Sequence, residues 1–117
     1  MSHDIVVRAR QIIEGEARAV AALCGQLDEH LAEVVDLLLH CEGHVLVAGA
    51  GTSNAIAQRF AHLLSCSGTP ALHISAADSL HGSAGAVTDR DVVFIISKGG
   101  QSTEINQFAA IARQRGA

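Results

Sequence analysis

The N-terminal part of the chain carries a helical pattern of apolar residues. They recur at steps of three and four positions between residues 4 and 41, which is the spacing of one face of an α-helix. Gly25 interrupts the pattern, and because glycine weakens a helix interior we predict two helices or one interrupted helix. Gly43 follows the last apolar position and is expected to cap the end of the helical region.

Three short apolar runs in the rest of the chain predict buried β-strands. They are HVLVAG (residues 44–49), ALHIS (71–75) and DVVFIIS (91–97), and glycine, proline or polar residues bound them. The run at 91–97 shows the strongest strand pattern of the three.

A helical segment follows the first strand. It is predicted over residues 53–67, with Thr52 or Ser53 as its N-cap and Gly68 at its end. The residues predicted to face inward are Ala55, Ile56, Phe60, Leu63 and Leu64.

A second long helix follows the third strand, over residues 103–114, with Thr103 as its N-cap and Gly116 at its end. Its inward-facing residues are predicted to be Ile105, Phe108, Ala109, Ile111 and Ala112. Residues 76–87, between the second and third strands, are small and glycine-rich and predict a short helix or turn followed by a loop.

The alternation of strands and helices predicts an α/β fold. We expect a doubly wound, flavodoxin-type parallel sheet with right-handed crossovers. The chain divides into an N-terminal helical segment, residues 1–43, and an α/β domain, residues 44–117. Three strands are few for a sheet that usually has about five or six, so we expect either a fragment of a longer fold or a partner chain that supplies the missing surface.

Composition and charge exclude several classes of function. The net charge is −4, Lys98 is the single lysine and aromatic residues make up 3%, so both the basic patch and the stacking surface of a nucleic-acid-binding protein are missing. No apolar run approaches the length of a membrane span, and the N-terminus lacks the apolar core of a signal peptide. We expect a cytoplasmic protein without a membrane partner, whose three cysteines are reduced thiols.

Glycine and hydroxyl residues follow two of the predicted strands. Residues 49–53 read GAGTS after the first strand, and residues 97–104 read SKGGQSTE after the third. Glycine lets the backbone approach a ligand, and a helix that follows such a loop points its free N–H groups into it. Either loop alone fits an ordinary capped turn equally well. As a pair at the carboxyl ends of parallel strands they predict a site for an anion such as phosphate.

The chain resembles a known family through these same segments. VLVAGAGTSNAIAQRFAHLLSCSGTPA, then SLHGSAG, then DVVFIISKGGQSTEI resembles the sugar isomerase (SIS) domain of phosphosugar isomerases and phosphosugar-binding regulators. Within that superfamily the arabinose-5-phosphate isomerase group is the most similar. The resemblance implies an SIS fold that is incomplete at its C-terminal end, a sugar phosphate as the partner and no cofactor or metal. We also expect a homo-oligomer, a dimer or a tetramer.

The resemblance assigns residues to the site by position. In the first loop it places Gly49, Gly51, Thr52 and Ser53 beside the ligand. In the second loop it places there Ser97, Gly100 and Ser102, and we add Lys98 as a candidate binding residue. It implies a catalytic role for Glu104 and a place near the reacting atoms for His81.

Two positions depart from the family pattern. Thr52 stands where the isomerase group has a lysine, and Gly99 stands where the second loop has a serine. Lys98 could supply the missing cation, although an exposed loop lysine without a role fits it equally well. The family's later Glu and His would lie beyond Ala117, so we expect part of the family's active site to be missing.

The chemistry that the resemblance implies is aldose–ketose isomerisation, in which a proton moves between C1 and C2 through an enediol. That reaction needs a base near C2 and donors for the enediolate oxygen. Glu104 is the predicted base, and His81 could assist ring opening or proton transfer, or bind a metal. Both also fit structural roles, as a first-turn acid and a loop hydrogen bonder. A non-catalytic phosphosugar sensor and a purely structural paralogue remain as alternatives.

A further cluster, His40, Cys41 and His44, lies at the junction between the helical region and the first strand. These residue types bind metals. Capping of the helix end is the interpretation that we expect to hold.

Overall fold

The structure is a computed structural model that describes residues 1–117, apart from the side chain of residue 2. The chain forms two compact units, residues 1–35 and 36–117. The first unit holds α1 (Ser2–Ala22), the 3-10 helix η1 (Leu23–Gln26) and the start of α2 (Glu29–Leu39). Gly25 lies within η1, so the predicted interruption is confirmed.

The second unit is built on a parallel sheet of three strands in the order β2-β1-β3. The central strand is β1 (Val45–Gly49), and β2 (Ala71–His73) and β3 (Val92–Ile96) flank it. All three predicted strands are confirmed apart from their exact ends, and the parallel pairing confirms the α/β fold class. The chain runs from β1 to β2 on one side and then crosses to β3 on the other. The gap between β1 and β3 is therefore the topological switch point of the sheet.

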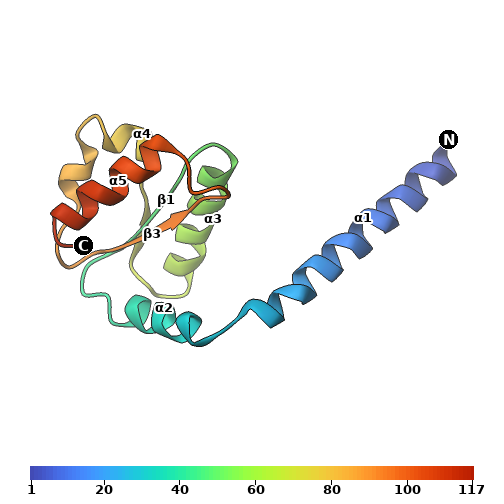
Figure 1. Cartoon of the computed structure of the whole chain (residues 1–117), viewed down its shortest axis with the longest axis horizontal. Helices are drawn as coiled ribbons and strands as arrows, with labels where there is room; N and C mark the ends of the chain where they lie inside the picture. The colour runs from blue at the N-terminus through green and yellow to red at the C-terminus, as the bar shows by residue number, and fades with distance from the viewer. The chain divides into compact units, whose positions relative to one another are not determined.

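Helices cover both faces of this sheet (Figure 1). On one face lies α3 (Thr52–Cys66), and on the other lie α4 (Ala76–Ser79), the 3-10 helix η2 (Ser83–Ala86) and α5 (Thr103–Gln114). Strand β1 contributes to both layers, because Val45 and Val47 belong to the cluster around α3 whereas Leu46 and Ala48 belong to the cluster around α5. Burial on both faces explains why this strand is a continuous apolar run.

The predicted helix over 103–114 is confirmed at both ends. Ile105, Phe108 and Ala112 are buried, and Gly116 has the left-handed φ of 93° that a glycine after a helix end adopts. Its predicted N-cap is wrong by one residue, because Ser102 takes that position and its side chain makes no capping hydrogen bond. The N-cap of α3 is likewise Gly51, with no capping bond from a side chain.

The inward face predicted for the 53–67 helix is partly wrong. Its buried residues are Ala57 and Ala61, whereas Ile56 and Leu63 stay exposed. Small side chains toward the sheet let α3 lie close to β1, and Leu64 packs against the same cluster as predicted. The larger Ile56, Phe60 and Leu63 lie beside β3 instead. A groove of about 320 Å³ on that edge is lined by Ile56, Arg59, Phe60, Leu63, Phe94 and Ile96.

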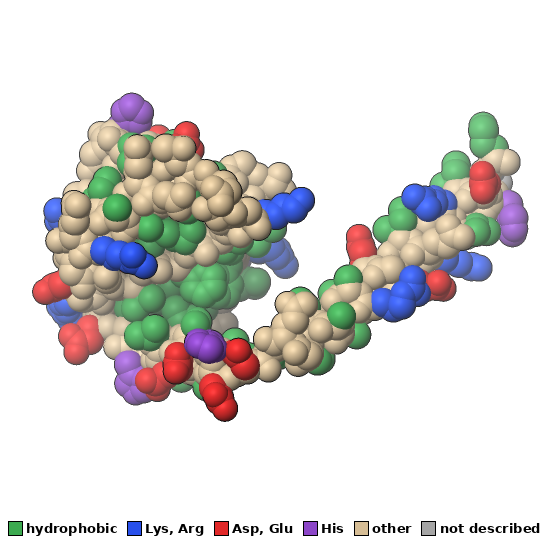
Figure 2. Space-filling model, viewed as in Figure 1, with side chains coloured by type: hydrophobic (Ala, Val, Ile, Leu, Met, Phe, Trp, Pro, Cys, Tyr) green, Lys and Arg blue, Asp and Glu red, His purple; other side chains and the backbone are tan. Residues whose placement is uncertain are grey.

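A second groove flanks β3 on the opposite face of the sheet. Its volume is about 290 Å³, and Val93 and Ile95 of the strand line it together with Ala109 and Ala112 of α5. Figure 2 shows apolar side chains exposed on the surface of this part of the molecule. The outer edge of β3 is therefore apolar on both sides.

The expectation for Gly43 is wrong, because α2 already ends at Leu39. Gly43 is instead needed for close packing. A Cβ atom built on it would lie 2.7 Å from the carbonyl oxygen of Arg90 and would also collide with the carboxylate of Asp91. Its N–H donates to the Arg90 carbonyl at 2.7 Å. The segment before β1 is thereby fixed against the segment before β3.

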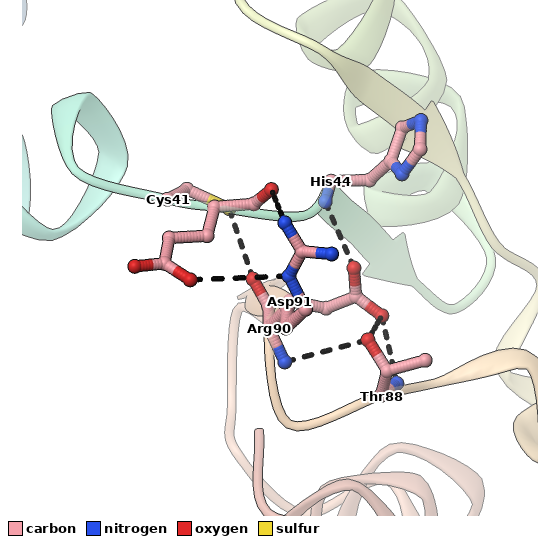
Figure 3. A network of polar contacts seen from close by, with 6 residues as sticks. Cys41, His44, Thr88, Arg90 and Asp91 are labelled. Carbon is pink, nitrogen blue, oxygen red and sulfur yellow. Dashed lines mark hydrogen bonds and ion pairs between the residues drawn. The ribbon is translucent and has the colours of Figure 1, made fainter.

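Asp91 holds this junction together (Figure 3). The residue is 9% exposed, and its carboxylate accepts hydrogen bonds from the His44 N–H at 2.8 Å, the Thr88 N–H at 2.7 Å and the Thr88 hydroxyl at 2.9 Å. Burial raises the pKa of Asp91, but the hydrogen bonds from His44 and Thr88 outweigh it, so its pKa lies below the ordinary value.

We predict that Asp91→Asn lowers the free energy of unfolding by about 1–3 kcal/mol near neutral pH. All three donors lose a charged acceptor, and those that face the amide nitrogen lose their acceptor altogether. Since the pKa of Asp91 is lower in the folded chain than the unfolded value of about 3.9, its stabilising effect is present above that value and is lost as the pH falls through the folded pKa. Urea unfolding from about pH 7 down to about pH 3 should show the two proteins converging. Asp89→Asn, at an exposed neighbour, is the control, and a parent–variant difference that does not change with pH would contradict the assignment.

We also predict that Gly49→Ala destabilises the second unit by about 1–3 kcal/mol. An added Cβ would lie 2.6 Å from the Ser53 carbonyl and 2.8 Å from the Asn54 nitrogen, so the first turn of α3 would have to move. Gly85→Ala is the matched control, because nothing lies within 4 Å of a Cβ at that position. Equal stability of the two variants in urea unfolding would show that this close contact is not required.

Candidate functional site

The carboxyl ends of β1 and β3 lie side by side. Gly49 is paired with Ile96 in the parallel register, so residues 50–53 and 97–102 leave the sheet next to each other. Open α/β sheets bind ligands in this crevice, where the strand order reverses. The structure therefore brings together the two loops that the sequence analysis singled out.

The first loop presents unpaired backbone donors. Gly51 has a φ of 58° and turns the chain into α3, a conformation that favours glycine. Across the described residues, the N–H groups of Gly51, Thr52 and Ser53 form no hydrogen bond, whereas the Asn54 N–H donates to the Gly51 carbonyl at 3.0 Å. Thr52 is exposed and Ser53 is half-buried. The loop can therefore offer several N–H groups and two hydroxyls to one acceptor group.

The second loop is held in shape by its own polar groups. The Gly100 N–H donates to the Ser97 hydroxyl oxygen at 2.9 Å, and Gly100 has a left-handed φ of 63°. The Asn106 side chain donates to the Gly100 carbonyl at 3.3 Å. Ser97 can still donate its hydroxyl proton, and the Ser102 side chain makes no capping bond. Two hydroxyls of this loop thus remain available as donors.

The electrostatics of this edge favour an anion. Both α3 and α5 begin here, so the positive ends of two helix dipoles meet at the crevice. The first turn of α3 contains no acidic residue, and the exposed Lys98 lies in the second loop. Glu104, in the first turn of α5, is the acidic residue that follows the second loop.

The two candidate catalytic residues lie on separate elements. Glu104 is exposed on α5, and His81 is exposed in the turn after α4, where its N–H donates to the Asp78 carbonyl at 3.0 Å. Within the described part of the chain, neither side chain forms a hydrogen bond or ion pair with the other or with a loop residue. Helix α4 packs against α5, so the two residues lie on neighbouring elements.

One polar contact at this edge was not anticipated from the sequence. The His73 ring nitrogen Nε2 lies 2.7 Å from the Asn54 side-chain oxygen, and both residues are partly buried. His73 ends β2, and Asn54 lies in the first turn of α3. An inward-facing histidine at the end of a strand is the signal that could have revealed a polar partner.

The His40, Cys41 and His44 cluster does not converge on a common point. The His40 Nδ1 lies 2.9 Å from the Asp36 carbonyl oxygen at the end of α2, and the Cys41 thiol lies 3.7 Å from the Arg90 carbonyl oxygen. Residues 1 and 3–117 contain no group of three or more histidine, cysteine or acidic side chains placed to hold a metal ion. The same residues include no helix that is both long enough and apolar enough to span a membrane.

The chain matches the family model described as the SIS domain over residues 38–117. It is 34% identical over 106 residues to arabinose 5-phosphate isomerase GutQ of Escherichia coli K12, covering 91% of this chain and 33% of that protein. It is 31% identical over 102 residues to arabinose 5-phosphate isomerase KpsF of Escherichia coli, covering 86% of this chain and 31% of that protein. The chain thus spans about a third of the length of the curated relatives that it matches.

Solved structures share the fold. An E. coli CFT073 protein, c3406, in complex with a sugar-phosphate ligand matches with a TM-score of 0.92 and 27% identity, covering 99% of this chain and 62% of that one. A candidate sugar-phosphate isomerase from Listeria monocytogenes matches with a TM-score of 0.90 and 30% identity, covering 97% and 60%. The shared fold agrees with the family match over the second unit. This chain belongs to the SIS domain family.

Proposed function

We propose that this chain binds a sugar phosphate across the carboxyl ends of β1 and β3. The pairing of Gly49 with Ile96, which sets the two donor-rich loops beside each other, is the observation that supports it. A phosphate group has several acceptor oxygens, which suit unpaired N–H groups at two helix N-termini. Relatives named arabinose 5-phosphate isomerases, and a fold neighbour solved with a sugar-phosphate ligand, support the same class of ligand.

In this proposal the first loop holds the phosphate through backbone groups. Gly49 and Gly51 bring the backbone close to the ligand, the N–H groups of residues 51–53 donate to phosphate oxygens, and the hydroxyls of Thr52 and Ser53 add further donors.

The binding role belongs to residues 44–117, and the N-terminal helical segment, residues 1–43, serves packing in a homo-oligomer.

The second loop completes the cradle from the neighbouring strand. Ser97 and Ser102 donate hydroxyl hydrogen bonds, Gly100 shapes the turn, and Lys98 supplies the only lysine charge of the chain. Since the net charge is −4, affinity in this proposal comes from these short-range donors rather than from a basic field.

We further propose that the chain is an aldose–ketose isomerase acting on a pentose phosphate such as arabinose 5-phosphate. Glu104 removes the proton from C2 while the C1 carbonyl oxygen takes a proton from water, and an enediol forms. The same carboxyl then returns a proton to C1, while the hydroxyl on C2 gives its proton to the hydroxide left from that water and becomes the ketone. Atoms and charge balance without a cofactor, and His81 assists ring opening.

Glu104→Gln should separate chemistry from binding. We expect the rate of proton–deuterium exchange at C2 of arabinose 5-phosphate to fall by about 10²–10⁴-fold, because a positioned base is lost. The dissociation constant should change by less than about three-fold, since the exposed Glu104 carboxylate is not one of the donors to phosphate. NMR in deuterated buffer measures the exchange, and calorimetry measures the binding.

Glu42→Gln provides the control, because it removes the same charge from an exposed side chain before β1, at the opposite end of the strands. If Glu104→Gln exchanges the C2 proton as fast as the parent, Glu104 is not the base. If the parent binds none of a panel of pentose, hexose and heptose phosphates, the proposed ligand class is wrong.

The second candidate function is a phosphosugar sensor without turnover. Two observations favour it: Thr52 and Gly99 stand where the isomerase group and the family pattern have lysine and serine. The backbone donors of the first loop do not depend on either side chain. Binding could therefore persist in a chain that has lost the side chains for chemistry.

Thr52→Lys tests this candidate. If the chain is a sensor, we expect the parent to bind a sugar phosphate without C2 exchange, and the variant to gain measurable exchange with less than about a ten-fold change in affinity. Gln58→Lys, an exposed position nearly two turns further along α3, controls for the added charge. Exchange in the parent at the variant's rate would rule out the sensor.

A further inference from the structure

The hydrogen bond between His73 and Asn54 joins two elements that are distant in sequence at the edge of the sheet where the loops leave it. The His73 Nε2 and the Asn54 Oδ1 are 2.7 Å apart, and the residues are 19 positions apart in the chain. Since a carboxamide oxygen only accepts, Nε2 must carry the hydrogen. His73 is thus either the neutral tautomer with hydrogen on Nε2 or the protonated ring.

The register of the sheet explains why His73 can reach α3. His73 pairs with Val47 of β1, and the N–H of the next residue, Ile74, donates to the Val47 carbonyl at 2.9 Å. Val47 packs in the cluster around α3, so alternation along the strands puts the side chain of His73 on the same face of the sheet. The histidine therefore stands on a rigid strand that is held by its central neighbour.

Asn54 lies at the junction between the first loop and its helix. Its backbone nitrogen packs 2.8 Å from where a Cβ of Gly49 would be, and Thr52 and Ser53 immediately precede it. The remaining hydrogen bonds of this turn are local, since the Asn54 N–H donates to the Gly51 carbonyl three residues before it. The bond to His73 ties the turn to a different strand.

We propose that His73 is a positioning residue of the candidate site, and that it acts through Asn54 to hold the first loop in the conformation that binds the ligand. The inference rests on the proposed sugar-phosphate function for its effect on affinity. Without this bond the turn that carries Thr52 and Ser53 samples more conformations, and an oriented set of donors loses affinity when it must first be ordered.

The first test needs no ligand. His73→Phe keeps a ring of similar size and removes the N–H donor, whereas His73→Gln retains a side-chain N–H. Hydrogen–deuterium exchange of the backbone amides of residues 54–57, the first hydrogen-bonded ones of α3, should become about three- to ten-fold faster in His73→Phe and return toward the parent in His73→Gln. Unchanged exchange in His73→Phe would overturn the inference, whatever the ligand proves to be.

The second test is a double-mutant cycle in the affinity for arabinose 5-phosphate, using His73→Phe, Asn54→Ala and the double variant. Each single change should raise the dissociation constant by about three- to ten-fold, the range expected for one hydrogen bond. The double variant should be no weaker than the weaker single variant, because His73 acts through Asn54. His62→Phe is the matched control, since His62 is an exposed histidine further along α3, beside Cys66, and should leave affinity unchanged.

The outcomes separate the two proposals. Strictly multiplicative effects of the single changes would show that His73 does not act through Asn54, and would overturn this inference while leaving sugar-phosphate binding intact. A parent that binds no sugar phosphate refutes the proposed function, and the amide-exchange experiment then decides by itself whether His73 orders the loop.

Discussion

The close contact between Gly49 and the first turn of α3 is the constraint on which the rest of the site depends. A strand that ended in any larger residue would push the Ser53 carbonyl and the Asn54 nitrogen away from the sheet. Because Gly49 is also paired with Ile96, the same residue sets the position of the first loop relative to the second. The absence of a side chain at Gly49 therefore lets α3 begin close to the sheet, and the pairing of Gly49 with Ile96 places the first loop beside the second.

Local patterns predicted the elements well because their causes are local. The apolar run of β3 and the helical period of α5 arise from neighbours within a few positions, and both elements lie where the pattern placed them. The glycine and hydroxyl residues of the two loops were also visible, since turns and helix starts require them. What the pattern could not supply was the strand order, which makes β3 and not β2 the neighbour that shares the switch point.

The predictions that failed depend on partners far away in the sequence. Gly43 was expected to cap a helix, but it is small because the Arg90 and Asp91 segment packs against it. The inward face of α3 was assigned by size, yet Ala57 and Ala61 meet the sheet and Ile56 lies over the open side of β3. Periodicity shows which residues are apolar, but it cannot show whether a layer in the same chain covers them.

Because most donors of the first loop are backbone groups, ligand binding and catalysis can be lost independently in this fold. The groups of the first loop that suit an anion are mostly backbone N–H groups, held by the register of β1 and β3 and by the start of α3. Thr52 is exposed and a Cβ at Gly99 would meet nothing within 4 Å, so both positions can change without disturbing that backbone. Gly49 cannot, because a Cβ there would collide with the first turn of α3. A sheet edge of this kind can keep an anion site while residues for proton transfer are gained or lost around it. That asymmetry gives a physical reason why a single SIS scaffold could serve both an isomerase and a sensor, and why tests of the two must measure affinity and exchange separately.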